Sequence, residues 1–440
     1  MALFPQEALN EGVRKREVFG WAMYDFANSG YATVVLTAVF NAYFVGVAAN
    51  NAEWATLAWT LALALSSLIV MLTMPAIGAY ADLRAAKKRL LLITTVGCVI
   101  ATLLLARVGK GDVALAFAAI VVSNTFYAYG ESLTAAFLPE LARRESIGRV
   151  SGWGWSFGYF GGMLSLGLCL AYVLWAQSKG LPATEFVPVT MLITAGVYGI
   201  ASVATFALLR ERAVAQIEAQ PGPATGHGLR ATLVRLGRTL SRARAFSDFC
   251  WLLACGAAYQ AGISVVIALA AVYAEQVLGF KQADTMLLVF LVNIAAALGA
   301  FVFGAYQDRV GHKKALALTL VGWIVMTVLA AMAQSAALFW VAAVIAGLCM
   351  GSSQSAGRAM AGAFAPRLQL AEFFGLWTFA TRLAAIIGPV TYGLVTWVTG
   401  GNHRLAIVST AVFFVIGLIL LIPMNVQRGI DAAKARGGGH

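Results

Sequence analysis

Apolar runs of about twenty residues recur along the whole chain, and they limit its possible folds more than any other feature. Each run is long enough to cross the ~30 Å hydrocarbon core of a bilayer as a helix. Of the 440 residues, 60% are hydrophobic and 11% charged, whereas a soluble domain carries roughly 25% charged residues. The composition therefore excludes a soluble enzyme, a soluble nucleic-acid-binding protein and a disordered regulator.

The apolar windows between polar breaks predict twelve membrane spans, which makes the expected fold class all-α. Glycine and proline inside a span are tolerated when neighbouring helices satisfy the freed backbone groups. The expected spans are 18–47, 55–80, 90–108, 113–138, 152–176, 186–209, 249–278, 285–306, 315–333, 336–361, 371–398 and 405–424.

The basic residues fix the expected orientation. Of the 31 Lys and Arg residues, 24 fall on one side of the predicted spans, five fall on the other, and Arg358 and Arg382 lie inside spans. The positive-inside rule then places both termini in the cytoplasm, as expected for a multi-pass protein of the cell inner membrane. The net charge of +12 is a topology signal and does not indicate nucleic-acid binding.

The longest loop divides the spans into six and six. We expect a cytoplasmic segment at 1–17, a bundle at 18–209, a basic linker at 210–247, a second bundle at 248–425 and a tail at 426–440 that ends in an expression remnant. The linker is either a solvated tether or an amphipathic helix on the inner leaflet, since Arg235, Arg238 and Arg242 share one helical face.

The two bundles are copies of one unit. Gly78-x-x-x-Asp82-x-x-x-x-Lys87-Lys88 follows the second span, and the same pattern returns after the eighth. The second copy is Gly304-x-x-x-Asp308-x-x-x-x-Lys313-Lys314, and Ala136-Phe137-x-Pro139 likewise returns as Ala363-Phe364-x-Pro366. A parallel repeat predicts two pseudo-symmetric bundles with the same orientation.

Twelve spans in two parallel halves, a basic middle loop and this repeated signature resemble the major facilitator superfamily. The second copy fits the family pattern, and the first departs from it at Leu83 and Ala85. The resemblance implies the major facilitator fold, a monomer, and a conformational latch that favours one state. The latch residues are Gly78, Asp82, Gly304, Asp308, Arg309 and Lys313.

The segment Trp21-Ala-Met-Tyr-Asp-Phe-Ala-Asn-Ser29 is similar to the opening of the vacuole-effluxer-like, autophagy-related branch of that superfamily. Fungal members of the branch are associated with amino-acid export from the vacuole. The resemblance therefore implies a secondary transporter of a small polar or zwitterionic solute, most readily an amino acid, that works by alternating access. Proton coupling and proton-free facilitation both stay open.

Four ionisable residues stand out inside the predicted spans: Asp25, Glu131, Arg358 and Arg382. A charge at that depth costs about 2.5–3.5 kcal/mol on insertion scales, so such residues usually face the interior of a bundle. Both acids are in the first half and both bases in the second. Because Glu131 and Arg358 occupy equivalent positions in the repeat, we expect them to approach each other or a shared ligand.

Three roles fit these charges: contact with substrate or proton, gating alone, or static structure. An amine would find acceptors at the acids, and a carboxylate would find bidentate donors at the arginines. Nearby polar side chains either contribute to the same site or make ordinary interhelical hydrogen bonds. They are Tyr24, Asn28, Asn124, Tyr127, Tyr259, Gln260 and Gln354.

Other functions have weaker support. The five cysteines fall in apolar runs, the four histidines are far apart, and no Walker-type loop is present, so we expect no metal, no cofactor and no enzymatic activity. Export of lipid-like compounds is an alternative, because Trp153, Trp155, Phe157 and Tyr159 make the fifth span aromatic. A non-transporting receptor or scaffold is the other. The expected partners are a small solute, protons and membrane lipids.

The orientation can be tested with thiol labelling. A cysteine at Gly226 or Gly228, in the predicted cytoplasmic linker, should resist membrane-impermeant maleimide added outside intact cells and react after permeabilisation. A cysteine at Gly109, in a predicted outer segment, is the positive control. Rapid labelling of the linker in intact cells would contradict the predicted number of spans.

Overall fold

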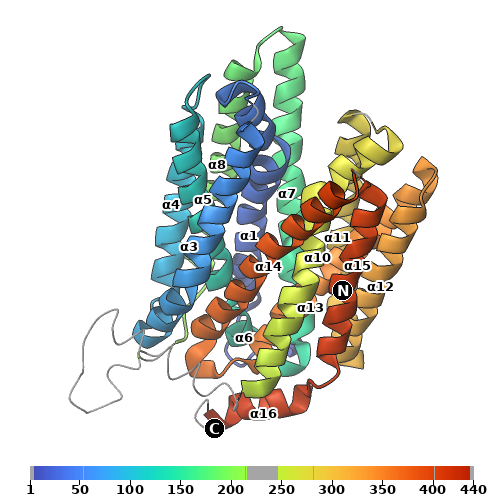
Figure 1. Ribbon diagram of the computed structural model, residues 1–440. Coiled ribbons are helices and arrows are strands. Elements are labelled where there is room, and N and C mark those ends of the chain that lie inside the picture. Colours follow the sequence, from blue (N-terminus) through green and yellow to red (C-terminus); the bar gives the residue numbers. More distant parts are fainter. Residues whose placement is uncertain are drawn as a thin grey trace.

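The structure, a computed structural model, describes residues 4–52, 54–213, 215, 246–280, 282–400 and 402–436. The described residues are almost entirely helical, and twelve of their helical segments are long and apolar enough to cross a membrane. Figure 1 shows these helices as two bundles that converge toward the lower end of the view. The prediction of an all-α membrane protein with twelve spans is confirmed.

The first bundle contains six spans and two short helices. Its elements are α1 (Lys15–Tyr31), α2 (Phe40–Tyr43), α3 (Ala55–Arg84), α4 (Lys87–Leu105), α5 (Val113–Ala135), α6 (Leu138–Leu141), α7 (Ile147–Ser178) and α8 (Ala183–Leu208).

The second bundle contains six spans and a terminal helix. Its elements are α10 (Ser247–Leu278), α11 (Gln282–Val310), α12 (His312–Met332), α13 (Ala336–Phe364), α14 (Leu370–Val398), α15 (His403–Leu421) and α16 (Val426–Arg436).

Several helices extend beyond the ends of the predicted spans. Helix α3 continues to Arg84 and α13 to Phe364, while α7 begins at Ile147. Hydropathy ends a span at the first polar residues, although the helix continues past them into the interfacial region. Helix α8 ends at Leu208 and α10 begins at Ser247. The part of the linker with Arg235, Arg238 and Arg242, for which a solvated tether and an amphipathic helix were both considered, lies outside the described residues.

The first span is interrupted by wide turns. Residues Ala32–Ala38 and Phe44–Ala48 form π-type segments on either side of α2. The span ends at Asn50 and Asn51, whose φ angles of 51° and 54° lie in the left-handed region that asparagine tolerates. These wide turns lie beyond Asp25 on the same span, so the charged part of α1 itself remains regular.

The surface pattern is that of a protein whose solvent is lipid. On α3, the side chains of Leu61, Leu65, Leu68 and Leu72 repeat at helical spacing and are 41–64% exposed. The opposite side of the helix buries Ser66 and its neighbours. An apolar exterior over a partly polar interior fits a bilayer, in which polar groups must find partners within the protein.

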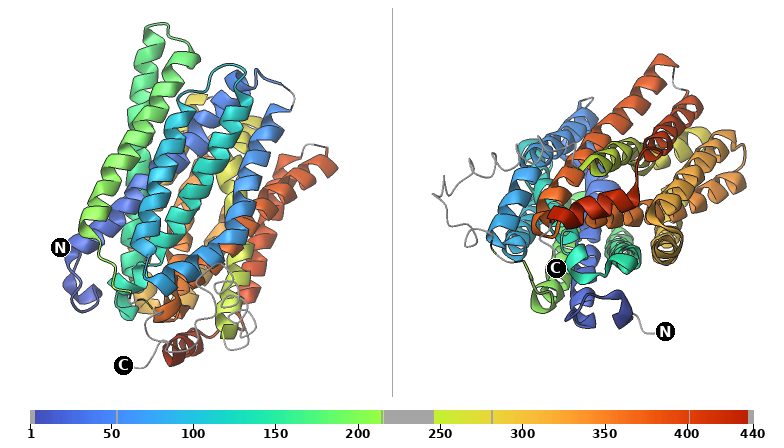
Figure 2. Two further views of the ribbon diagram at one scale, coloured as in Figure 1. Left: turned by 90° about the vertical axis from the view of Figure 1, so that its left-hand side faces the viewer. Right: turned by 90° about the horizontal axis from the view of Figure 1, so that it is seen from below.

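Both chain ends lie at one end of the bundle, which we call the basic face. There the N-terminal segment pairs with the chain after α6, since the backbone N–H of Asn10 donates to Leu141 O at 3.0 Å. Helix α16 lies across the same end (Figure 2, right) and is fixed by the 2.6 Å ion pair between Arg428 and Asp248. We expect this face to be cytoplasmic.

Candidate functional site

The four charges in the membrane-spanning helices form two ion pairs, and each pair joins the two bundles. Arg358 Nη1 on α13 lies 2.6 Å from Asp25 Oδ2 on α1, and Arg382 Nη2 on α14 lies 2.9 Å from Glu131 Oε2 on α5. The Asp25 and Arg358 side chains are only 10% and 8% exposed. Those of Glu131 and Arg382 are 37% and 17% exposed. One pair is thus sealed and the other reaches solvent.

Glu131 and Arg358 were expected to approach each other or a shared ligand, and in this conformation they form no direct ion pair with each other. The repeat places these two residues at matching positions, but Glu131 pairs with Arg382 on the helix packed against its own, and Arg358 reaches past a neighbouring helix to Asp25. Helix α5 packs against α14, which brings Arg382 to Glu131. Helix α13 packs against α7, and Arg358 passes beside α7 to reach Asp25.

Arg358 is held on every side. Its Nη2 donates to Ser151 O at 2.8 Å and its Nε donates to Ser151 Oγ at 3.2 Å, in addition to the bond with Asp25. Its guanidinium carbon also lies 4.9 Å from the ring centre of Trp21 and 5.1 Å from that of Trp155. These distances are those of cation–π contacts. All three guanidinium nitrogens therefore have acceptors, and the cation lies against two indole rings.

Gly154 makes this arrangement possible. A Cβ at Gly154 would lie 2.5 Å from both Arg358 Nη2 and Asp25 Oδ2, so any larger residue would displace the ion pair. On the same helix, Gly161 allows α7 to approach the backbone of Phe26 in α1. The small residues of α7 thus leave space for the charges as well as for close helix packing.

Four of the polar residues predicted near the acids lie in the interior of the first bundle. The Tyr24 hydroxyl lies 3.1 Å from Thr95 Oγ1 and also contacts Tyr198. Asn124 Nδ2 donates to Ser66 Oγ at 2.5 Å. These contacts are ordinary interhelical hydrogen bonds, the simpler of the two roles considered. Tyr127 packs on Tyr31, with ring centres 5.2 Å apart, and Asn28 is buried one turn beyond Asp25.

The polar residues of the second bundle form a separate group. Gln260 Nε2 donates to Gln354 Oε1 at 2.7 Å, and a return bond of 3.2 Å joins the same two side chains. This amide pair links α10 to α13 one turn away from Arg358. The Tyr259 hydroxyl is buried and has no acceptor among the described residues.

The two aspartates of the repeated motif fasten the bundles together at the basic face. Asp82, near the end of α3, accepts from the backbone N–H groups of Ala371 at 3.1 Å and Glu372 at 2.9 Å, at the start of α14. Asp308, near the end of α11, accepts from Gly148 and Arg149, both at 2.9 Å, at the start of α7. Each carboxylate caps the positive end of a helix in the opposite bundle.

The motif glycines allow these contacts. A Cβ at Gly78 would lie 2.1 Å from Ala371 O, and one at Gly304 would lie 2.6 Å from Gly148 O. The helices therefore touch through their backbones where the aspartates bind. We use the term latch for each aspartate with the helix start that it caps. With both latches formed, the basic face is closed.

The basic residues of the motif act within their own bundles. Lys313 Nζ donates to Ile422 O at 2.8 Å and to Met424 O at 2.9 Å, which caps the end of α15. In the first copy, the ammonium group of Lys87 pairs with Glu140. Arg309 is exposed at the end of α11. These contacts brace the helix ends next to the latches.

Glu211 holds the start of α4 in the same region. It accepts from the backbone N–H of Lys87 at 2.7 Å and from that of Lys88 at 3.0 Å. Partial burial raises the pKa of this carboxyl, although the two backbone bonds oppose the shift. The chain after α8 is thereby tied to the basic end of the first bundle.

Several residues at the interface were not predicted from the sequence as site residues. Ser151 Oγ donates to Ser355 O at 2.9 Å, and Ser132 Oγ donates to Phe374 O at 3.2 Å, each across the two bundles. Trp21 is anchored within its own bundle, where Nε1 donates to Thr134 O at 2.9 Å. Ser151 and Trp155 lie four residues apart on α7. That spacing, which places both side chains on one face of the helix, is the feature of the sequence from which their shared site could have been predicted.

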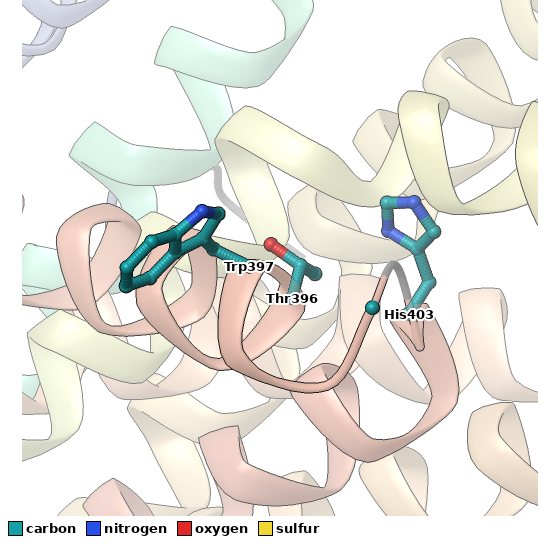
Figure 3. Close-up of a pocket in the computed structure, with 4 residues that line it drawn as sticks. Thr396, Trp397 and His403 are labelled. Atoms are coloured by element: carbon teal, nitrogen blue, oxygen red, sulfur yellow. The ribbon is translucent and has the colours of Figure 1, made fainter.

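A depression at the far end of the molecule is separate from these charges. Figure 3 shows its lining residues between the end of α14 and the start of α15. Its volume is about 430 Å³. Thr396, Trp397, Gly400 and His403 line it. Residue 396 is fourteen positions beyond Arg382 on α14, roughly 21 Å along the helix axis. The depression is shallow and has no charged side chain in its lining.

The sequence matches the family described as vacuole effluxer Atg22 like over residues 56–434. The chain belongs to the vacuole effluxer Atg22-like family. This match confirms the resemblance inferred from the Trp21–Ser29 segment, which lies outside the matched range.

Two relatives of the effluxer-like chain show how far the similarity extends. It is 25% identical to the uncharacterized MFS-type transporter YxiO of Bacillus subtilis over 94% of this chain and 96% of that protein. It is also 25% identical to autophagy-related protein 22-1 of Aspergillus niger, over 64% of this chain and 48% of the fungal protein. The chain thus spans about half the length of that fungal relative.

Among solved structures, the human organic anion transporter MFSD10 (TETRAN) aligns with a TM-score of 0.72. The alignment covers 92% of this effluxer-like chain and 99% of that one at 15% identity, so it shows the major facilitator fold alone. The family, the bacterial relative and the fold together make the chain a multi-pass MFS-type transporter.

The latches predict how the basic face opens. The double variant Asp82→Asn and Asp308→Asn keeps the side-chain shape but loses both charges at the helix starts. A cysteine replacing the buried Ser355, in a background without native cysteines, should then react with maleimide on the order of tenfold faster, because about 1.4 kcal/mol corresponds to a factor of ten.

Asp112→Asn is the matched control for the latches. Asp112 caps the backbone N–H of Gly109 at the opposite end of the molecule, so this variant should not change labelling at position 355. Equal labelling rates in the double latch variant and the parent would contradict the role of the latches.

The pairing of charges predicts which double variant recovers. Glu131→Arg or Arg382→Glu alone places like charges together and should lower the apparent Tm and the yield. Glu131→Arg combined with Arg382→Glu restores an opposite pair and should recover most of the loss. Glu131→Arg combined with Arg358→Glu leaves Asp25 beside a glutamate, and should be worse than either single variant. Recovery in the second combination instead would refute the observed pairing.

Proposed function

We propose that this transporter moves a small zwitterionic solute, an amino acid, by alternating access between its two bundles. The observation that carries the proposal is the arrangement of the two inter-bundle ion pairs. Both acids stand on the first bundle and both bases on the second. When the bundles part, acceptors remain on one wall and donors on the other, which matches an ammonium group and a carboxylate.

The energetics favour a ligand between the walls. Separating a buried pair without compensation costs about 3–5 kcal/mol, and a solute with both charges offsets part of that cost. Arg382 is well placed for a carboxylate, because its Nη2 serves Glu131 while its buried Nε has no acceptor among the described residues. The solute then stabilises the conformation in which the pairs are broken, as alternating access requires.

The closed basic face defines one end state of the proposed cycle. Opening that face breaks both latches, both ion pairs and the serine bonds between the bundles, so a solute that engages the broken pairs shifts the balance toward opening. Similarity to an MFS-type transporter and membership of an effluxer-like family support export as the direction. We propose the cell inner membrane as the site of action, with the basic face in the cytoplasm.

Glu131 is our candidate for the coupling proton. Its side chain is 37% exposed, against 10% for Asp25, so water reaches it while its partner is still in place. A proton that neutralises Glu131 removes the attraction to Arg382 and releases α14 from α5. Asp25 is sealed against water in this conformation and serves the gate.

Export of amphiphilic compounds has less support from the structure. The aromatic residues that suggested it have partners inside the protein: Trp153 packs on Phe4 with ring centres 4.9 Å apart, and Trp155 lies against Arg358. Both rings therefore pack against other residues of the protein.

Uptake into proteoliposomes tests the proposal. A panel of radiolabelled amino acids should include at least one that is accumulated, and a pH gradient should raise accumulation if a proton is coupled. A liposome with the unfolded or omitted protein sets the background. Absence of transport for every amino acid, with transport of a lipid-like dye in the same vesicles, would overturn the assignment.

Glu131→Gln separates coupling from gating. With the charge removed and the shape kept, gradient-driven accumulation should fall at least about tenfold while exchange of internal for external solute persists. Glu185→Gln, at an exposed acid in the first turn of α8, is the matched control and should behave as the parent. A parallel loss of exchange and accumulation would assign Glu131 to gating alone.

A further inference from the structure

Arg358 occupies a cage that belongs entirely to the other bundle. Trp21 and Asp25 come from α1, and Ser151 and Trp155 come from α7. Each helix supplies its two residues four positions apart, so both point from one helical face. We call these four residues the cage. The only part of the site that comes from the second bundle is the cation itself.

Two parts of the cage, the Trp21 ring and the backbone of α7, are fixed within the first bundle. Trp21 is fixed by its bond to Thr134 O in the first bundle. Helices α1 and α7 pack directly, and Gly161 brings α7 against the backbone of Phe26. The indole N–H of Trp155 is buried without an acceptor among the described residues, so the ring's contact with Arg358 is through its face. Trp21 and the α7 backbone, including Ser151 O, therefore keep their places when the bundles separate, while Asp25 and the Ser151 hydroxyl lose their partners in the second bundle.

The geometry points to a second role for the cage, which rests on the proposed transport function. We propose that, once Arg358 withdraws with α13, the cage binds the guanidinium group of the transported solute. The solute class is then an amino acid or amine with a guanidino side chain. Arg358 acts as an internal stand-in for the solute in the closed conformation.

Three features favour guanidinium over other cations. Arg358 uses three different nitrogens on three acceptors: Asp25 Oδ2, Ser151 O and Ser151 Oγ. A planar guanidinium reproduces this fork, whereas a compact ammonium cannot reach all three acceptors in one plane. Two indole faces also suit a flat, weakly hydrated cation. An alkylammonium group should bind, but more weakly.

Chemical rescue tests the cage directly. Arg358→Ala empties it and leaves Asp25 without its partner. In nanodiscs, 10–50 mM ethylguanidinium should raise the apparent Tm of this variant by about 2 °C or more. Ethylammonium should give a smaller shift, and neutral ethylurea should give none. Equal shifts with ethylurea and ethylguanidinium would overturn the proposal.

Two controls assign any rescue to the cage. Arg358→Ala combined with Trp155→Leu should lose the response to ethylguanidinium. Arg382→Ala empties the other ion pair, where Glu131 stands without the two indoles, and should respond much less than Arg358→Ala. Undiminished rescue in either control would place the guanidinium elsewhere.

A second measurement keeps Arg358 and so does not depend on the folding of that variant. In the protein with cysteine at position 355, arginine or agmatine should raise the maleimide labelling rate several-fold, because filling the cage excludes Arg358 and favours the open basic face. Citrulline, the neutral analogue of arginine, should leave the rate unchanged, and Trp155→Leu should abolish the effect of arginine.

These results separate the cage from the broader transport proposal. Transport of neutral amino acids with no response to guanidinium would overturn the cage and leave the transport proposal standing. Guanidinium rescue without uptake of any amino acid would support the cage as a guanidinium site and overturn the transport proposal.

Discussion

The cost of placing charge and backbone polar groups in hydrocarbon shapes the whole of this molecule. It forces the backbone into helices, and it forces the four intramembrane charges to find partners inside the protein. Here the partners are not within one bundle. Both pairs span the boundary between the bundles, so the interactions that satisfy these charges are also the interactions that hold the two halves together. When the two halves move apart, the four charges therefore need new partners.

Close backbone contact is the second requirement of the closed basic face. Gly78, Gly304 and Gly154 sit where a Cβ would collide with the opposite bundle or with the buried ion pair. The aspartate latches need the same closeness, because a carboxylate caps a helix start only at hydrogen-bond distance. Small residues and capping acids thus act together: the first allow the approach and the second stabilise it.

The sequence predicted the twelve spans and the family, because composition, charge bias and repetition are properties of long stretches and survive local errors. It also placed Asp82 and Asp308 in a latch role, and the structure puts both at helix starts in the opposite bundle. It failed on the partners of the four charges. Equivalent positions in a repeat predict the helix on which a residue lies and its depth, but the partner of a charge depends on how the helices pack. For Arg358, the absence of a side chain at Gly154 leaves the space in which it meets Asp25. For Tyr24 the sequence left two roles open, and because a helix turns 100° per residue its hydroxyl lies away from Asp25 and contacts Tyr198.

The repeat and the charges play different parts in this molecule. The two latches are near copies of each other, each an aspartate on the start of a helix in the opposite bundle. The two ion pairs are not copies, because one is sealed between indoles and the other reaches water. The parallel repeat relates the two bundles to each other at the same face of the protein, and it does not make the two ends equivalent. Substrate binding and proton coupling require that the two bundles contribute different groups. The few residues in which the halves differ supply this asymmetry. The first half alone contains Asp25, Trp21 and Trp155. The residues that hold the Arg358 cation are therefore residues in which the two halves of the transporter differ.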